Sequence, residues 1–163
     1  MQASAFPACA WPPSRSLAPI PAMRPVDLLF NRYGGYHRHP VNKAIHWVCV
    51  PLIVWSLMGL LWAAAPIAAY AAVAAALGFY LWLSVPIALG MAAVLGAMLY
   101  ALTWLGERTL IVSAVVFVAA WAAQFVGHAI ERSRPSFLED VRSFLVGPAW
   151  LLGFVYRRLG IAV

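Results

Sequence analysis

Residues 33–51, YGGYHRHPVNKAIHWVCVP, join a polar, proline-rich beginning of the chain to a long apolar run. Three of the four histidines, His37, His39 and His46, lie in this stretch. The fourth, His128, lies near the end of the last long apolar run, in QFVGHAIERSRP (residues 124–135). We therefore expect residues 33–51 to start the first membrane helix and to supply most of a polar site.

The composition excludes an ordinary soluble domain. Of the 163 residues, 64% are hydrophobic and only 10% are charged, with a mean hydropathy of +0.84, whereas a soluble domain has roughly a quarter charged residues. We predict an all-α integral membrane protein. Basic residues in such proteins mark the cytoplasmic flanks, so the net charge of +6 does not indicate a nucleic-acid partner.

The beginning of the chain differs from the rest. Residues 1–25 contain six prolines, a density that prevents a stable helix and predicts a disordered leader. Met23 opens a more ordinary sequence, and we expect residues 1–22 to be dispensable. We assign residues 26–163 to a single helical membrane domain.

Four apolar segments have the length of about 20 residues that a membrane helix needs. They cover about 41–65, 66–83, 87–104 and 110–130. Prolines, glycines and charged residues separate them, because these residues interrupt helices or favour water. The sequence predicts four transmembrane helices in contact with the lipid bilayer.

A fifth, amphipathic helix is expected at residues 136–146. Ser136 and Glu139 match a capping box, and Leu138, Val141 and Leu145 recur at helical spacing. This pattern predicts a helix that lies in the membrane interface and ends at Gly147 and Pro148.

The basic residues predict the orientation. Five of them precede or open the first span, five follow the fourth, and only Arg108 lies between. The positive-inside rule then places both termini in the cytoplasm, whether the membrane is a bacterial inner membrane or the endoplasmic reticulum. The histidine-bearing ends of the first and fourth spans therefore lie at the same face.

Polar residues on these two spans share helix faces. Asn42 and His46 are four residues apart, and Gln124, His128 and Glu131 form one stripe on the fourth span. Polar groups at membrane depth are costly and usually face a cavity or each other. We expect the two stripes to meet.

The histidines are candidate metal ligands. His37, His46 and His128 share one membrane depth, and imidazole is a common ligand. His39, between Arg38 and Pro40, fits a solvated helix cap better than a metal site.

Two interpretations of Glu131 are open, an ion pair with Arg132 or Arg134 or a role in the site. Tyr33 and Tyr36 are close enough in the sequence to donate hydrogen bonds there.

The two polar motifs carry a resemblance. The patterns Y-x-x-x-H and N-x-x-x-H in residues 33–46, followed by Q-F-x-G-H-x-x-E in residues 124–131, resemble the family of small membrane proteins related to the yeast endoplasmic-reticulum 2-hydroxy fatty acid dioxygenase. The resemblance extends from about Met23 to the C-terminus.

The resemblance implies an Fe(II)-dependent dioxygenase that uses dioxygen to shorten long-chain 2-hydroxy fatty acids by one carbon, in alpha-oxidation. By motif match, the essential histidines of the family correspond to His37, His46 and His128. His39 stands where the family is expected to have another residue, such as asparagine, which leaves its role open.

The same chemistry suggests roles for the neighbouring residues. Glu131 would ligate the iron or orient a histidine, and Asn42 and Gln124 would fix imidazoles or bind the substrate carboxylate. The acyl chain would lie among the alanine-rich spans.

Other classes stay open at this point. A zinc hydrolase, a haem-binding electron carrier or a non-enzymatic membrane protein of lipid metabolism would share the composition. Four histidines are too few for a di-iron membrane hydroxylase. The sequence leaves open whether the protein forms an oligomer.

Overall fold

A computed structural model describes residues 23–133, 135 and 140–163. Within them every regular element is helical. The elements are α1 (Pro25–Gly35), α2 (Pro40–Ala64), α3 (Pro66–Leu83), α4 (Val85–Thr103), the 3-10 helix η1 (Gly106–Arg108), α5 (Thr109–Glu131) and α6 (Ser143–Arg158).

Four helical segments are long and apolar enough to cross a membrane, namely α2, α3, α4 and the unit from Gly106 to Glu131. This confirms the predicted all-α membrane architecture, with bounds that differ by one or two residues except at the start of the last unit. Prolines open three of these helices, at Pro40, Pro66 and Pro86. Proline suits a first turn because an N–H there has no partner within the helix.

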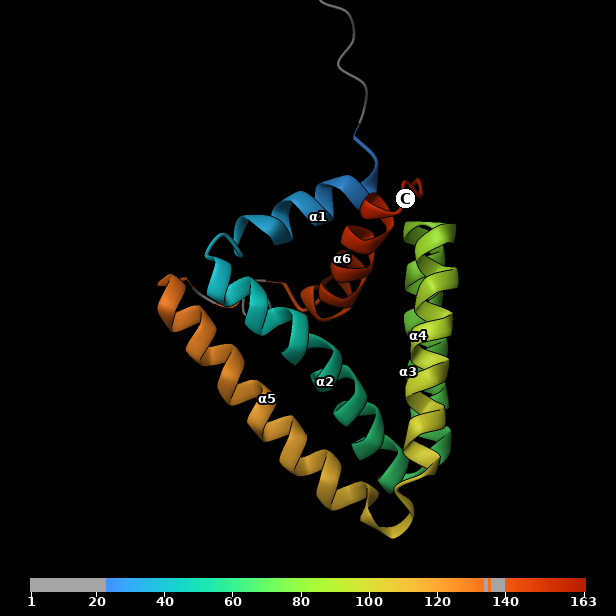
Figure 1. The fold of residues 1–163 in the computed structure, drawn as a ribbon. Coiled ribbons are helices and arrows are strands. Elements are labelled where there is room, and N and C mark those ends of the chain that lie inside the picture. The colour runs from blue at the N-terminus through green and yellow to red at the C-terminus, as the bar shows by residue number, and fades with distance from the viewer. Residues whose placement is uncertain (1–22, 134, 136–139) are drawn as a thin grey trace, which may run out of the picture.

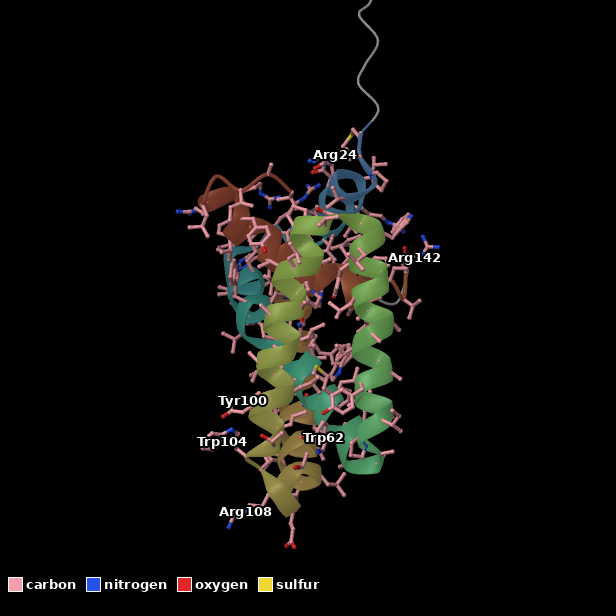
Figure 2. The ribbon with its side chains drawn as sticks, turned by 90° about the vertical axis from the view of Figure 1, so that its right-hand side faces the viewer. Arg24, Trp62, Tyr100, Trp104, Arg108 and Arg142 are labelled. Carbon is pink, nitrogen blue, oxygen red and sulfur yellow. The ribbon has the colours of Figure 1, made fainter. Side chains whose placement is uncertain are left out.

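The helix α2 is the centre of the arrangement. It packs against α5 on one side and against the α3–α4 pair on the other, while α1 and α6 cover one end of the bundle (Figure 1). Arg24 and Arg142 lie at the covered end, whereas Trp104 and Arg108 lie at the opposite end (Figure 2). The two ends therefore differ in charge as the sequence predicted.

Small residues allow α2 and α5 to pack closely. A Cβ atom added at Gly59 of α2 would meet the side chain of Ser113 on α5, and one added at Gly127 of α5 would meet Asn42 on α2. Close approach of this kind is the usual basis of helix association in lipid. It fixes the contact at both ends of the pair.

The predicted interfacial helix at 136–146 is wrong in its bounds. Residues 136–139, with the capping box, lie outside the described part, and Asp140–Arg142 are not helical. The helix begins at Ser143 and continues through Pro148 to Arg158. The helix continues past Pro148 and buries Gly147 against Tyr33 of α1. Packing on α1 stabilises this helix, which the local sequence signals do not favour.

The two ends of the described chain meet. The helix α1 starts at Pro25, so the last residue of the predicted leader is helical; residues 1–22 lie outside the described part. The Arg24 guanidinium donates to the Asp27 carboxylate and to the carbonyl of Val163. Both ends therefore lie on one side of the bundle.

Candidate metal centre

Three helical elements bring three histidines together at the covered end of the bundle. His37 lies in the turn after α1, His46 in the second turn of α2 and His128 in the last turn of α5. Their exposed fractions are 1%, 3% and 5%. One nitrogen from each ring lies within 4.8 Å of the others. His46 and His128, which are 82 positions apart in the sequence, therefore share one site.

Backbone carbonyls fix which nitrogens face each other. Nδ1 of His37 lies 2.8 Å from the Tyr33 carbonyl, and Nδ1 of His46 lies 2.9 Å from the Asn42 carbonyl. A carbonyl only accepts, so each Nδ1 carries the proton and each Nε2 presents a lone pair. These two Nε2 atoms are only 2.9 Å apart.

The arrangement fits a metal ion. Two lone pairs at this distance repel unless a cation lies between them, and buried imidazoles held by carbonyls are the usual form of histidine ligands. Ligand nitrogens about 2.1 Å from one ion lie about 3 Å apart when their bonds meet at a right angle. The third imidazole, from His128, completes a set that leaves other coordination positions open. Imidazole suits iron, zinc, copper and nickel.

Burial keeps the imidazole of His37, the clustered histidine that lies outside the spans, neutral. Desolvation lowers the pKa of His37 below its ordinary value, although the hydrogen bond to the Tyr33 carbonyl acts in the opposite direction. A neutral imidazole is the form that binds a metal. His37 is therefore in its ligating form near neutral pH.

Glu131 fastens the end of α5 to the start of α2. Its Oε1 accepts from the backbone N–H groups of Arg38 (2.5 Å) and His39 (3.1 Å), and its Oε2 accepts from the side chain of Asn42 (2.5 Å). Among the described residues it forms no ion pair with Arg132, and Arg134, the other predicted partner, lies outside them. Both of its oxygens are thus bound to α2 and the turn before it, and Glu131 is not one of the clustered candidate ligands.

Asn42 contacts both helices. Its Oδ1 is buried with no hydrogen-bond partner among the described residues, and it lies where a side chain on Gly127 would stand. The glycine next to His128 therefore makes room for α2. Close packing at this point sets the distance between His46 and His128.

The remaining predicted residues have separate places. His39 is the N-cap of α2, where its Nδ1 accepts from the Val41 N–H, and it is only half-buried.

Tyr33 stacks on His37 with ring centroids 4.4 Å apart. Tyr36 lines a small outer cavity with Arg32 and Asp140. Gln124 is buried one turn before His128.

A family model described as 2-hydroxy-palmitic acid dioxygenase Mpo1-like matches residues 23–159. The chain belongs to the Mpo1-like family. The match includes the six α-helices of the described residues and the three clustered histidines. Neither the curated proteins nor the solved structures compared with the chain gave a match.

Within this Mpo1-like region, two neighbours of the site were missed from sequence. Ser133 lies beyond the end of α5, and its hydroxyl is 3.1 Å from Nδ1 of His128. The left-handed backbone at Arg132, with φ of 55°, turns the chain back so that this contact forms. Trp150 of α6 approaches Tyr33 and His37, with ring centroids 5.5 and 6.2 Å away. No spacing in the sequence indicates either contact, because both depend on how the chain turns after α5.

Proposed function

We propose that this protein is an Fe(II)-dependent membrane dioxygenase that removes one carbon from long-chain 2-hydroxy fatty acids. The observation that carries the proposal is the set of three buried imidazoles, His37, His46 and His128, with ligand nitrogens within 4.8 Å of one another. Membership of the Mpo1-like family supports both the reaction and the substrate class.

The reaction balances without an added reductant. A 2-hydroxy acid and one molecule of dioxygen give the acid shorter by one carbon, carbon dioxide and water. His37, His46 and His128 would hold the iron, which supplies activation of dioxygen when it is bound. The hydroxyl and carboxylate of the substrate are suitable groups for the open positions.

The chain contributes positioning and exclusion of water. The carbonyls of Tyr33 and Asn42 hold two imidazoles in the ligating tautomer. Glu131 keeps the turn that carries His37 against α5 through its bonds to the N–H groups of Arg38 and His39. Tyr33 covers one face of the His37 ring, and its burial raises the pKa of its phenol, so no further negative charge arises beside the site.

The proposed orientation places the histidines at the cytoplasmic face. Arg24 and Arg142 lie at that end, and Arg108 lies at the other (Figure 2). The excess of arginine and lysine on one side determines the orientation of most membrane proteins. A water-soluble co-substrate or product would then exchange with the cytoplasm.

Metal analysis and turnover test this proposal together. Protein purified without oxygen should contain iron and consume dioxygen only with a 2-hydroxy fatty acid. Alanine at His37, His46 or His128 should remove most of the iron and nearly all activity, because the ligands act as a unit. His39→Ala is the matched control and should retain both.

Two results would contradict the proposal. Full iron content and turnover in the His128→Ala protein would show that α5 does not contribute to the metal site. Stoichiometric zinc with no oxygen consumption would instead indicate a hydrolase.

A further inference from the structure

A groove leads away from the histidines along one face of α2. On this helix its lining residues follow helical spacing for about four turns. They are His46, Val50, Ile53, Val54, Leu57, Met58 and Leu61. We call this feature the α2 groove. Its walls include Ala72, Ala76 and Tyr80 of α3, and Trp121, Gln124 and Phe125 of α5.

Polarity changes along the α2 groove. The polar lining residues Tyr33, Gln124 and His128 lie at the histidine end. The hydroxyl of Tyr80, another lining residue, donates a hydrogen bond to the Leu145 carbonyl. Beyond Val50 the α2 side of the groove is entirely apolar as far as Leu61. A ligand with one polar end and a long apolar tail matches this distribution.

Gln124 has hydrogen-bonding capacity to spare at the polar end. Its side chain is 6% exposed, lines the groove, and makes no hydrogen bond to another described residue. The side chain faces the groove, where its amide can donate to a ligand carboxylate or accept from a ligand hydroxyl. The position is one helical turn from His128.

The length of the α2 groove suits a long acyl chain. His46 and Leu61 are fifteen residues apart, so this face of α2 is about 22 Å long at 1.5 Å per residue. An extended chain of tetrahedral carbons advances about 1.25 Å per bond, from bonds of about 1.5 Å and angles near 111°. The groove therefore matches about 18 carbons.

The groove opens toward the lipid. It lies between α3 and α5, which flank α2 on different sides (Figure 1). Two of its lining residues, Leu57 and Phe125, are 44% and 50% exposed. Because these helices cross the membrane, the exposed side faces hydrocarbon and not water.

We propose that the α2 groove binds the tail of a single long-chain 2-hydroxy fatty acid, which enters sideways from the bilayer, and that α3 limits the length of that tail. The proposal rests on the function proposed above. It assigns Gln124 to the polar end of the ligand. It assigns Ala76 and Ala72 to the part of the groove that determines which chain lengths fit.

The α2–α3 connection predicts where each alanine acts. Val54 and Ala76 are each eleven residues from Ala65, where the two helices join, so they lie at a similar depth. Val54 is eight residues from His46, which corresponds to about 12 Å of helix and to about ten carbons. By the same reasoning Ala72 lies near Met58, deeper by about 6 Å.

Substitutions that fill the groove test the proposal. In phosphatidylcholine nanodiscs without oxygen, Ala76→Phe should weaken binding of radiolabelled 2-hydroxyhexadecanoic acid by about tenfold or more. It should leave the binding of 2-hydroxyoctanoic acid within about twofold. Ala72→Phe should weaken the hexadecanoic ligand but retain 2-hydroxydodecanoic acid. Ala75→Phe is the matched control, because Ala75 is exposed on α3 outside the groove lining.

The outcomes separate the two proposals. Binding by the wild-type protein without oxygen consumption would contradict the proposed function and leave the α2 groove supported. Turnover with the same chain-length profile in wild type, Ala72→Phe and Ala76→Phe would overturn the groove and leave the function intact. An equal loss of all chain lengths in the two groove variants, with thermal stability unchanged, would also overturn it, because a length limit must differ between the two depths.

Discussion

The Nε2 atoms of His37 and His46 lie at hydrogen-bond distance although neither has a proton to share. Both Nδ1 atoms are committed to carbonyls, so the 2.9 Å contact is favourable only with a cation between the rings. At the level of single residues, the hydrogen bonds of the imidazoles define the candidate metal site.

Glu131 is the residue that we expect to position these ligands. Glu131→Ala should lower iron affinity by about 10–100-fold, because loss of an outer hydrogen-bond partner loosens a ligand without removing it. Glu131→Gln should retain most of the affinity, since one amide oxygen can still accept from the Arg38 and His39 N–H groups. Iron titration of the purified variants measures the effect, and saturating iron should restore turnover in Glu131→Ala.

The exposed Glu107, at the opposite end of the bundle, provides the control for this substitution. Glu107→Ala should leave iron affinity unchanged. If Glu131→Ala lost iron and activity irreversibly, as an alanine at His128 should, then Glu131 would be a ligand instead of a positioning residue.

At the scale of elements, the contact between α2 and α5 holds the site together. These helices are joined only through α3, α4 and η1 along the chain, yet they supply His46 and His128 to one cluster. Gly59 and Gly127 permit the close approach, one toward each end of the contact. The separation of the ligands therefore depends on backbone packing as well as on the histidines themselves.

Gly127→Ala should disturb this contact. The added methyl group would meet Asn42 Oδ1 and lie 3.2 Å from Ile45 Cδ1, and overpacking of this kind costs about 1–3 kcal/mol. We expect a lower unfolding temperature and a lower iron affinity. Gly78→Ala is the control, because nothing lies within 4 Å of its Cβ position and alanine favours the helix by about 1 kcal/mol. Equal effects of the two substitutions would show that Gly127 is not a packing position.

At the scale of the whole molecule, the four spans bring the two ends of the described chain to the same end of the bundle. Arg24 reaches the Val163 carbonyl, and α1 packs on α6, so both ends cover the same face of the bundle. This cover shields the histidine cluster from above, while the α2 groove approaches it from the membrane. The groove therefore reaches the buried histidines from the membrane side, which suits a lipid substrate.

Reporter fusions test the orientation. Fusions at Met23 and at Val163 should both report the cytoplasm, because the basic residues gather at their end of the bundle. A cysteine placed at Glu107, in the turn between α4 and α5, should react with an impermeant reagent from the opposite side. Opposite locations for the two fusions would rule out four spans.

The sequence by itself determined the class of fold and the four membrane-spanning helices. Hydrophobic segments of the right length, bounded by Pro40, Pro66 and Pro86, encode the spans locally, and the four were predicted within one or two residues except at the start of the last. The sequence also indicated which ends of the first and fourth spans meet at the histidine cluster, because the positions of the charged residues, of His46 and of His128 follow from the order of residues. The bounds of the helix predicted at 136–146 were wrong over the described residues, because its pattern was local, whereas α6 is stabilised by contacts with α1.

Only the tertiary structure decided which candidate residues contact one another. Glu131 was about equally a candidate for an ion pair or for a role in the site, and its three N–H partners lie about ninety residues away along the chain. The same holds for Gly127, whose missing side chain makes room for Asn42, and for Trp150, which reaches His37 from α6. Sequence spacing specifies which residues share a helix face. Which faces meet, and at what distance, depends on the packing of helices that are far apart in the chain.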